Sequence, residues 1–253
     1  MALRDEIKRG REYFLESATR KEKFKYFIDY YGLRVALIAI ALIALITFII
    51  QTVTKPEPVL NGTFFNVAIY DTDDVLDKLK TDFEKAKELD TSKYSVSFNT
   101  NLTFSKDNEN NYQDYTLWEG LYAQMSAKVI DFIVGTSDQL LTLAYNEAFV
   151  DLSTILTEEQ MEQYKPYFLY IDQALVTLRR EDDSVNQEAF KIPFPDCTKP
   201  EEMEEPIPVM IDMSQMKSMQ ELYENNTKGL CYGIVANGEN RQNAVEFLEL
   251  ITK

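Results

Sequence analysis

The chain has 253 residues, with 26 Lys and Arg against 42 Asp and Glu, so its formal net charge is −16. An acidic chain of this kind lacks the basic face that binds phosphate groups, which argues against a nucleic-acid partner. The sequence contains no histidine, which excludes Ser-His-Asp and Cys-His catalysis and any zinc site that needs imidazole. Its eight glycines are too few for a Gly-rich nucleotide loop.

Positive and negative charges are separated along the chain. Residues 1–34 contain nine basic and six acidic residues, a net charge of +3, and the remainder carries −19. Between them, residues 35–54 are uncharged, and 20 helical residues span about 30 Å, the thickness of a hydrocarbon core. We therefore predict a transmembrane helix over residues 35–54, in which the hydroxyl of Thr47 bonds to its own helix backbone. A buried helix of a soluble core and a cleaved signal peptide are the alternatives. The run is apolar on every face, however, and longer than a signal-peptide core.

Basic residues beside the apolar stretch predict its orientation. Five Lys or Arg lie in the 20 residues before it, and one, Lys55, lies in the 20 residues after it. Because positive charge is retained on the cytoplasmic side, we expect a cytoplasmic N-terminus and an exported part of 199 residues. The protein is then a single-pass protein of the cell membrane with an extracellular C-terminal domain.

The arm formed by residues 1–34 is expected to be a basic juxtamembrane helix. Phe24, Phe27, Tyr30 and Tyr31 recur at helical spacing among charged residues. One hypothesis is that this helix lies along anionic lipid. The other is that it docks a cytoplasmic partner.

The exported part begins with a proline-containing linker, residues 55–61, which cannot continue the helix. Strand and helix patterns then alternate, which is typical of an α/β sandwich with a mostly parallel sheet, here over residues 62–253. The expected strands cover residues 63–70, 94–98 and 129–135, and the expected helices cover residues 71–86, 115–129 and 139–147.

The pattern becomes looser in the last third of the chain. A Pro- and Glu-rich loop separates two short apolar runs there. The expected elements are a helix from residue 158, one or two strands within 167–178, apolar runs at 189–193 and 207–211, a helix at 216–223, a strand at 230–235 and a last helix through residue 251.

Residues 125–152 resemble a recurrent stretch of bacterial extracellular solute-binding proteins of the sugar-binding type. The positions in step with it are Asp131, Phe149, Asp151 and Leu152. Residues 190–193 are similar to that family's hinge, and residues 234–248 are similar to a strand followed by its "Asn…Ala…Phe-Leu" helix. The resemblance covers about 130 of the 253 residues. It implies an α/β domain like one lobe of a type II periplasmic binding protein.

The length of the chain departs from that family. Only 13 residues lie between Pro193 and Ile207, where the family inserts much of its second lobe. One lobe cannot enclose a small ligand, so we expect a non-catalytic domain that binds another membrane or envelope protein. A small-solute receptor of a transport system is an alternative. Because α/β folds bind ligands at the carboxyl ends of strands, the candidate ligand-binding residues are Asp71, Thr136 and Ser137.

Residues 71–75 (DTDDV) follow an expected strand and resemble the first motif of haloacid-dehalogenase-like phosphatases. This implies a second alternative, a Mg²⁺-dependent cell-surface phosphatase in which Asp71 attacks phosphorus. Residues 133–137 would supply its second motif, and Asp182 with Asp183 its acidic pair. The favoured interpretation is that residues 71–74 only open a helix, where acids are stabilising.

Cys197 and Cys231 are both expected outside the membrane, where a disulfide is permitted. A bridge would close a loop of about 35 residues and contribute about 3–4 kcal/mol in the entropic description. Two separate, buried thiols are the alternative.

Residues 201–205 (EEMEE) form an acidic cluster that could hold Ca²⁺. They lack the spacing and the turn glycine of a calcium loop, so a solvated loop is favoured. We expect no metal and no cofactor.

Overall fold

The computed structural model describes residues 19–53, 55–67, 73–104, 112–182 and 187–252. The chain divides into two compact units, residues 1–55 and residues 56–253, called here the N-terminal unit and the α/β unit.

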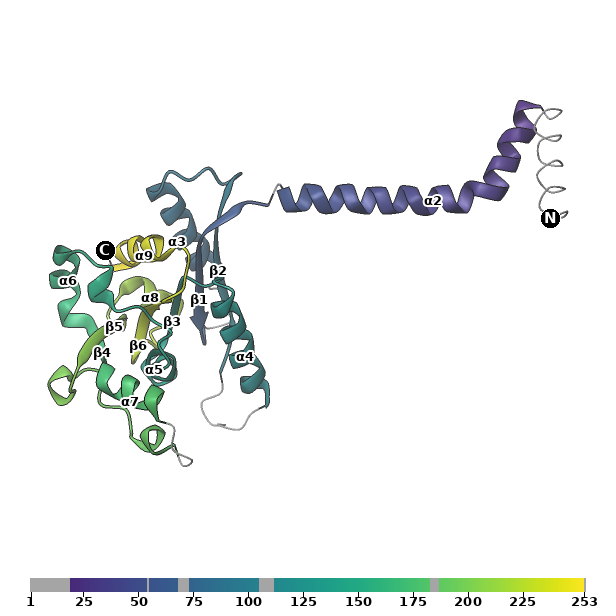
Figure 1. The fold of residues 1–253 in the computed structure, drawn as a ribbon. Helices are drawn as coiled ribbons and strands as arrows, with labels where there is room; N and C mark the ends of the chain where they lie inside the picture. Colours follow the sequence, from purple (N-terminus) through teal and green to yellow (C-terminus); the bar gives the residue numbers. More distant parts are fainter. Residues whose placement is uncertain (1–18, 54, 68–72, 105–111, 183–186, 253) are drawn as a thin grey trace. The chain divides into compact units, whose positions relative to one another are not determined.

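The N-terminal unit contains one long helix, α2 (Arg20–Val53), shown in Figure 1. Thr19 precedes it and donates from its N–H and hydroxyl to the Glu22 carboxylate, at 2.8 and 2.7 Å. Within α2, Tyr31–Ile49 has a mean hydropathy of 2.6, and none of it is buried. By length and composition this stretch is able to cross a membrane. The Thr47 hydroxyl donates to the Ile43 carbonyl at 2.8 Å, so the predicted bond to the helix backbone is confirmed.

The α/β unit is built on a six-stranded mixed sheet in the order β2-β1-β3-β6-β5-β4. β1 pairs in parallel with β2 and with β3, whereas β3 with β6, β6 with β5, and β5 with β4 are antiparallel. The strands are β1 (Glu57–Phe65), β2 (Tyr94–Leu102), β3 (Phe132–Thr136), β4 (Phe168–Asp172), β5 (Pro206–Asp212) and β6 (Leu230–Ile234).

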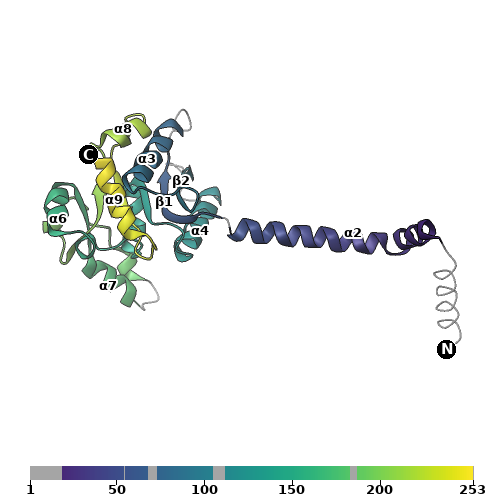
Figure 2. The ribbon, with the colours of Figure 1, turned by 90° about the horizontal axis from the view of Figure 1, so that it is seen from above.

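Helices cover both faces of the sheet and give a three-layer arrangement (Figures 1 and 2). One face packs against α3 (Asp73–Ala86), α6 (Glu158–Tyr164), α8 (Lys217–Leu222) and α9 (Arg241–Thr252). The other packs against α4 (Tyr112–Ser126), α5 (Ser137–Tyr145) and α7 (Gln173–Glu181). Four short 3₁₀ turns complete the described structure: η1 (Leu152–Thr154), η2 (Lys165–Tyr167), η3 (Glu188–Lys191) and η4 (Pro200–Glu202).

Close packing at the centre of the sheet requires a glycine. A Cβ atom added to Gly62 in β1 would lie 2.0 Å from the Phe132 ring. Phe132 stacks on Tyr232 and Phe247, with ring centroids 4.8 and 5.0 Å apart. The aromatic rings of β3, β6 and α9 therefore form one layer beneath a residue that has no side chain.

The expectation of a mostly parallel sheet is wrong, because β6 enters between β3 and β5 in the antiparallel direction. All five β6 residues are buried, as in a central strand covered on both faces. A strand buried on both faces is apolar throughout, and such a pattern carries no information about strand direction.

The first strand is also displaced from its predicted position. It was expected at residues 63–70, but β1 begins at Glu57, opposite Tyr94, and ends at Phe65. It ends there because Asn66 adopts the left-handed conformation, with φ 55°, and its side chain accepts the N–H of Phe104 at 2.7 Å. The linker expected over residues 55–61 is correspondingly short, since residues 57–61 already belong to the sheet.

Of the region expected to supply strands at 167–178, only β4 is strand, and α7 follows it directly. Asp172 ends the strand and caps the helix, because its carboxylate accepts the Ala174 N–H at 3.1 Å. The helices expected near residues 158, 216–223 and 251, and the strand near 230–235, are confirmed as α6, α8, α9 and β6.

Candidate functional site: strand ends and the apolar helix

The carboxyl ends of β1, β2, β3 and β5 lie at one edge of the sheet, because these strands run in the same direction. Thr136 is the last residue of β3 and Ser137 the first of α5, so both lie at the edge where the sequence predicted them. Asp71, the third candidate ligand-binding residue, lies outside the described residues.

Both described strand-end residues make local hydrogen bonds. The N–H and hydroxyl of Thr136 donate to the Gln139 side chain at 3.3 and 3.1 Å, an arrangement that begins α5. The Ser137 N–H donates to the Gly229 carbonyl at 2.7 Å. Gly229 has φ +70°, and an added Cβ would lie 3.3 Å from the Ser137 hydroxyl. These hydrogen bonds hold the junction of β3 and α5 in place. Ligand binding by Thr136 and Ser137 stays a prediction.

The loop between β5 and β6 contains a polar side chain that the sequence did not single out. The Tyr223 hydroxyl is buried and has no hydrogen-bond partner within the described residues. Burial raises its pKa, so it is a neutral donor at physiological pH. A tyrosine in an apolar helix pattern looks like ordinary core, so no sequence signal marked it.

Asp131, one of the positions in step with the solute-binding family, is a structural residue. Its side chain is 1% exposed and accepts the N–H groups of Asn61 and Asn240, each at 2.8 Å. Burial raises the pKa of Asp131, and those hydrogen bonds act in the opposite direction. The carboxylate joins β1, β3 and the chain entering α9.

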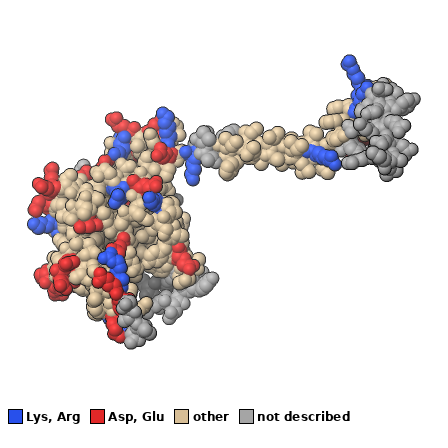
Figure 3. Space-filling model, in the orientation of Figure 1, with Lys and Arg blue, Asp and Glu red and all other residues tan. Residues whose placement is uncertain are grey.

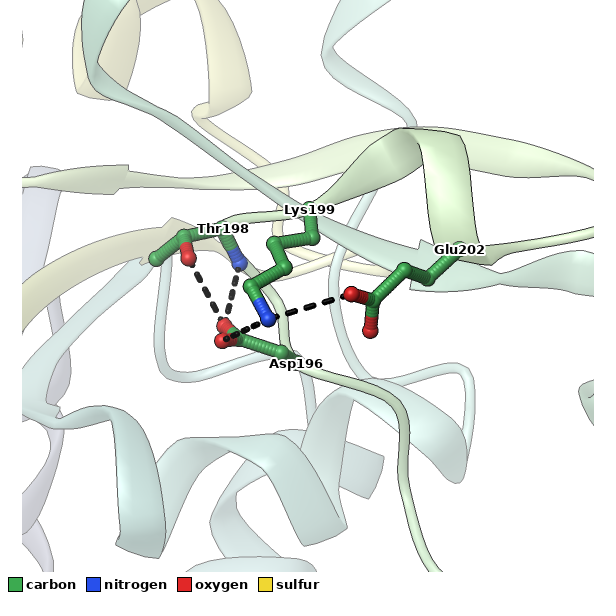
Figure 4. Close-up of polar contacts among 4 residues, drawn as sticks. All are labelled: Asp196, Thr198, Lys199 and Glu202. Carbon is green, nitrogen blue, oxygen red and sulfur yellow. Dashed lines mark hydrogen bonds and ion pairs between the residues drawn. The ribbon is translucent and has the colours of Figure 1, made fainter.

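The acidic loop at residues 201–205 is held through its backbone. The N–H groups of Glu204 and Glu205 both donate to the Asp172 carboxylate at 3.0 Å. Figure 4 shows the adjoining turn, in which Asp196 accepts two bonds from Thr198, and Lys199 contacts Asp196 and Glu202 at 3.7 and 3.1 Å. No cluster of three or more metal-ligating side chains occurs among the described residues.

The acidic pair assigned to the phosphatase alternative is only partly described. Asp182 follows α7 at its C-terminal end, and its carboxylate accepts the Ala189 N–H at 2.8 Å. In that position it ties the chain after α7 back to the helix. Asp183 and Asp71 lie outside the described residues, so the phosphatase alternative stays a prediction.

Arg179 fastens the segment that resembles the family's hinge. Its guanidinium lies over the Phe194 ring, 4.4 Å from the centroid, and donates to the carbonyls of Ala189 and Ile192 at 3.3 and 2.7 Å. Phe194 stacks in turn on Tyr145, with centroids 4.2 Å apart.

Beside this anchor, large apolar side chains are solvent-exposed on α7 and the following segment. Leu178, Phe190 and Ile192 are 50, 51 and 41% exposed, and we call these three the α7 patch. Exposed large apolar side chains that gather on one surface are typical of interaction sites. A separate shallow groove of about 460 Å³ lies between α3, α8 and α9, lined in part by Leu79, Met216 and Leu250.

Cys197 and Cys231 are free thiols in the structure, and both are buried. The predicted disulfide is therefore not formed, and the structure agrees with the alternative of two separate thiols. Cys231 Sγ lies 3.4 Å from the Gly135 carbonyl and 3.7 Å from Met210 Sδ, within the core between the sheet and α5. Burial raises the pKa of both thiols, so neither is poised as a nucleophile.

Charge is distributed differently on the two units. Figure 3 shows acidic and basic side chains scattered over the α/β unit, whereas most of the length of α2 carries neither.

Comparisons of the chain with models of protein families, with curated proteins and with solved structures find no match.

Proposed function

We propose that this protein is a single-pass membrane protein whose extracytoplasmic α/β unit binds another membrane or envelope protein without catalysing a reaction. The observation that carries the proposal is the exposed apolar surface of α2. Its large apolar side chains from Leu33 to Ile49 are 46–77% exposed. A soluble protein does not keep such a surface in water, whereas a bilayer buries it.

The distribution of charge supports a cytoplasmic N-terminus. Five basic residues precede the apolar stretch within 20 positions, and only Lys55 follows it within the same distance. The exported part carries −19, which repels anionic solutes and favours a basic or cation-rich partner.

The use of the buried carboxylates supports a binding rather than a catalytic role. The carboxylate oxygens of Asp131 and Asp172 accept hydrogen bonds from backbone N–H groups. The partly buried Asp182 carboxylate accepts one as well. The α7 patch offers apolar contact area, which suits a protein partner. The resemblance of residues 125–152, 190–193 and 234–248 to solute-binding proteins also supports a binding domain like one lobe of that family.

Photo-crosslinking in intact cells tests the proposal. Crosslinkers at Leu178 and Phe190 should capture one and the same membrane or envelope protein. A crosslinker at Lys217, whose side chain is 89% exposed on the opposite side of the sheet, should not.

Two outcomes with the purified protein would contradict the proposal. A saturable thermal shift with one sugar, amino acid or oligopeptide would indicate a solute receptor. Mg²⁺-dependent phosphatase activity that is lost in Asp71→Asn would indicate the enzyme.

A further inference from the structure

The first turns of α2, residues 20–34, carry an exposed apolar stripe. Phe24, Phe27, Ile28 and Tyr31 follow the spacing i, i+3, i+4, i+7, which places them on one side of a helix. Phe24, Phe27 and Ile28 are 64, 48 and 49% exposed, and the Phe27 and Tyr31 rings are 5.7 Å apart. The stripe leads into Tyr31, the first residue of the apolar stretch able to cross a membrane.

Basic residues border this stripe on both sides. At 100° per residue, Lys21 and Lys25 lie along one border, Lys23 and Arg34 lie along the other, and Arg20 lies at the N-terminal end of the stripe itself. The two acidic residues of the segment, Glu22 and Asp29, are seven positions apart and lie on the opposite side of the helix. Glu22 is engaged in the contact with Thr19 that precedes α2.

We propose that this basic-bordered face of α2 binds anionic phospholipid headgroups at the cytoplasmic surface of the membrane. The inference rests on the proposed membrane insertion of α2. When this helix lies on a bilayer, its aromatic rings and Ile28 enter the boundary between headgroups and acyl chains. The basic side chains then extend to the lipid phosphates, and the two acidic residues are on the side that faces water.

A groove beside the stripe combines the two chemistries that a phospholipid needs. It measures about 510 Å³ and is lined by Thr19, Lys21, Glu22, Phe24, Lys25 and Ile28. The Glu22 carboxylate in this lining accepts both hydrogen bonds from Thr19, which leaves the two lysines as its cationic groups. An acidic protein could also pair with the basic residues. The direct continuity of the stripe with the membrane-crossing stretch favours lipid.

The experiment uses the full chain in nanodiscs of phosphatidylcholine mixed equally with phosphatidylglycerol, with no other protein present. Native mass spectrometry counts the phospholipids that stay bound to the protein after the nanodisc around it has been removed. The test variant replaces Arg20, Lys21, Lys23 and Lys25 with Gln. The matched control removes the same number of charges from exposed positions of the α/β unit, with Gln at Lys78, Lys165, Lys217 and Lys228.

The wild type and the control should retain phosphatidylglycerol in preference to phosphatidylcholine. Because each basic residue near an anionic surface changes affinity about fivefold, the test variant should lose at least about tenfold of this preference. Equal retention of the two lipids by the wild type, or an unchanged preference in the test variant, would overturn the inference.

Resistance of the membrane-bound chain to alkaline carbonate is measured in parallel. Extraction of the wild type by carbonate would refute membrane insertion, and the inference with it. Resistance without lipid preference would refute the inference alone.

Discussion

The Asp131 carboxylate accepts the backbone N–H of Asn240, 109 positions later in the chain, at 2.8 Å. The same carboxylate accepts the N–H of Asn61, 70 positions earlier, also at 2.8 Å. One side chain thus connects β1, the beginning of β3 and the chain entering α9. These hydrogen bonds position the C-terminal helix α9 against β1 and β3.

Removing this carboxylate should destabilise the α/β unit. Asp131→Ala leaves two partly buried N–H groups without this acceptor and removes a buried side chain, and we expect a loss of about 2–4 kcal/mol in the free energy of unfolding. Trp118, the single tryptophan, stacks on Phe104 with centroids 4.4 Å apart, so its fluorescence in a denaturant titration reports the loss. Asp77→Ala, at an exposed position of α3, should cost less than about 0.5 kcal/mol. Equal stability of the two variants would contradict the assigned role.

Asp172 should make stability depend on acid pH. Burial alone would raise its pKa, but the N–H groups of Glu204, Glu205 and Ala174 together hold the pKa below the ordinary value of 3.8. Its contribution is therefore complete above that value and is lost as the pH falls through the lower folded pKa. Asp172→Asn should cost about 1–2 kcal/mol at neutral pH, and the difference from wild type should shrink between about pH 5 and about pH 2. A difference that stays constant or grows toward acid pH would show that the carboxylate is not stabilised by these bonds.

The neighbouring arginines 179 and 180 should behave differently. Arg179→Lys retains the charge but loses the planar fork that reaches two carbonyls over Phe194, so hydrogen exchange should accelerate at residues 187–196. Arg180 makes one exposed ion pair with Glu147 at 3.2 Å, so Arg180→Lys should leave the exchange unchanged. Similar exchange profiles for the two variants would argue against Arg179 as the anchor of this segment.

The cysteines should titrate as two thiols after unfolding. Cys231 is 0% and Cys197 8% exposed, so a thiol reagent should react slowly with the folded protein. In denaturant without reductant, two thiols per chain should react at once. Protein taken from the cell surface that yields no reactive thiol on unfolding would show that the disulfide forms after all.

Local patterns predicted much of this fold because each element depends on its own residues. The apolar, uncharged run predicted the long helix, and the helix expected over residues 115–129 corresponds to α4. Asp131 was singled out only by the resemblance to solute-binding proteins, and its hydrogen-bond partners Asn61 and Asn240 are remote in sequence and left no local signal.

The remaining features depend on tertiary pairing. The direction of β6 is set by its neighbours β3 and β5 and not by its own apolar residues. Arg179 stands in a charged run, and its position over the Phe194 ring depends on a residue 15 positions later in the chain. The Tyr223 hydroxyl, which has no hydrogen-bond partner in the described part of the chain, is buried by core packing, which no periodicity reveals.

The central claim is that α2 crosses the membrane with the N-terminus inside and the acidic unit outside. Protease added to intact cells whose walls have been removed tests it most directly, with antibodies against each end of the chain. The α/β unit after residue 55 should be digested while the arm before the apolar stretch is protected. Protection of the α/β unit in sealed cells, with digestion only after lysis, would contradict the account.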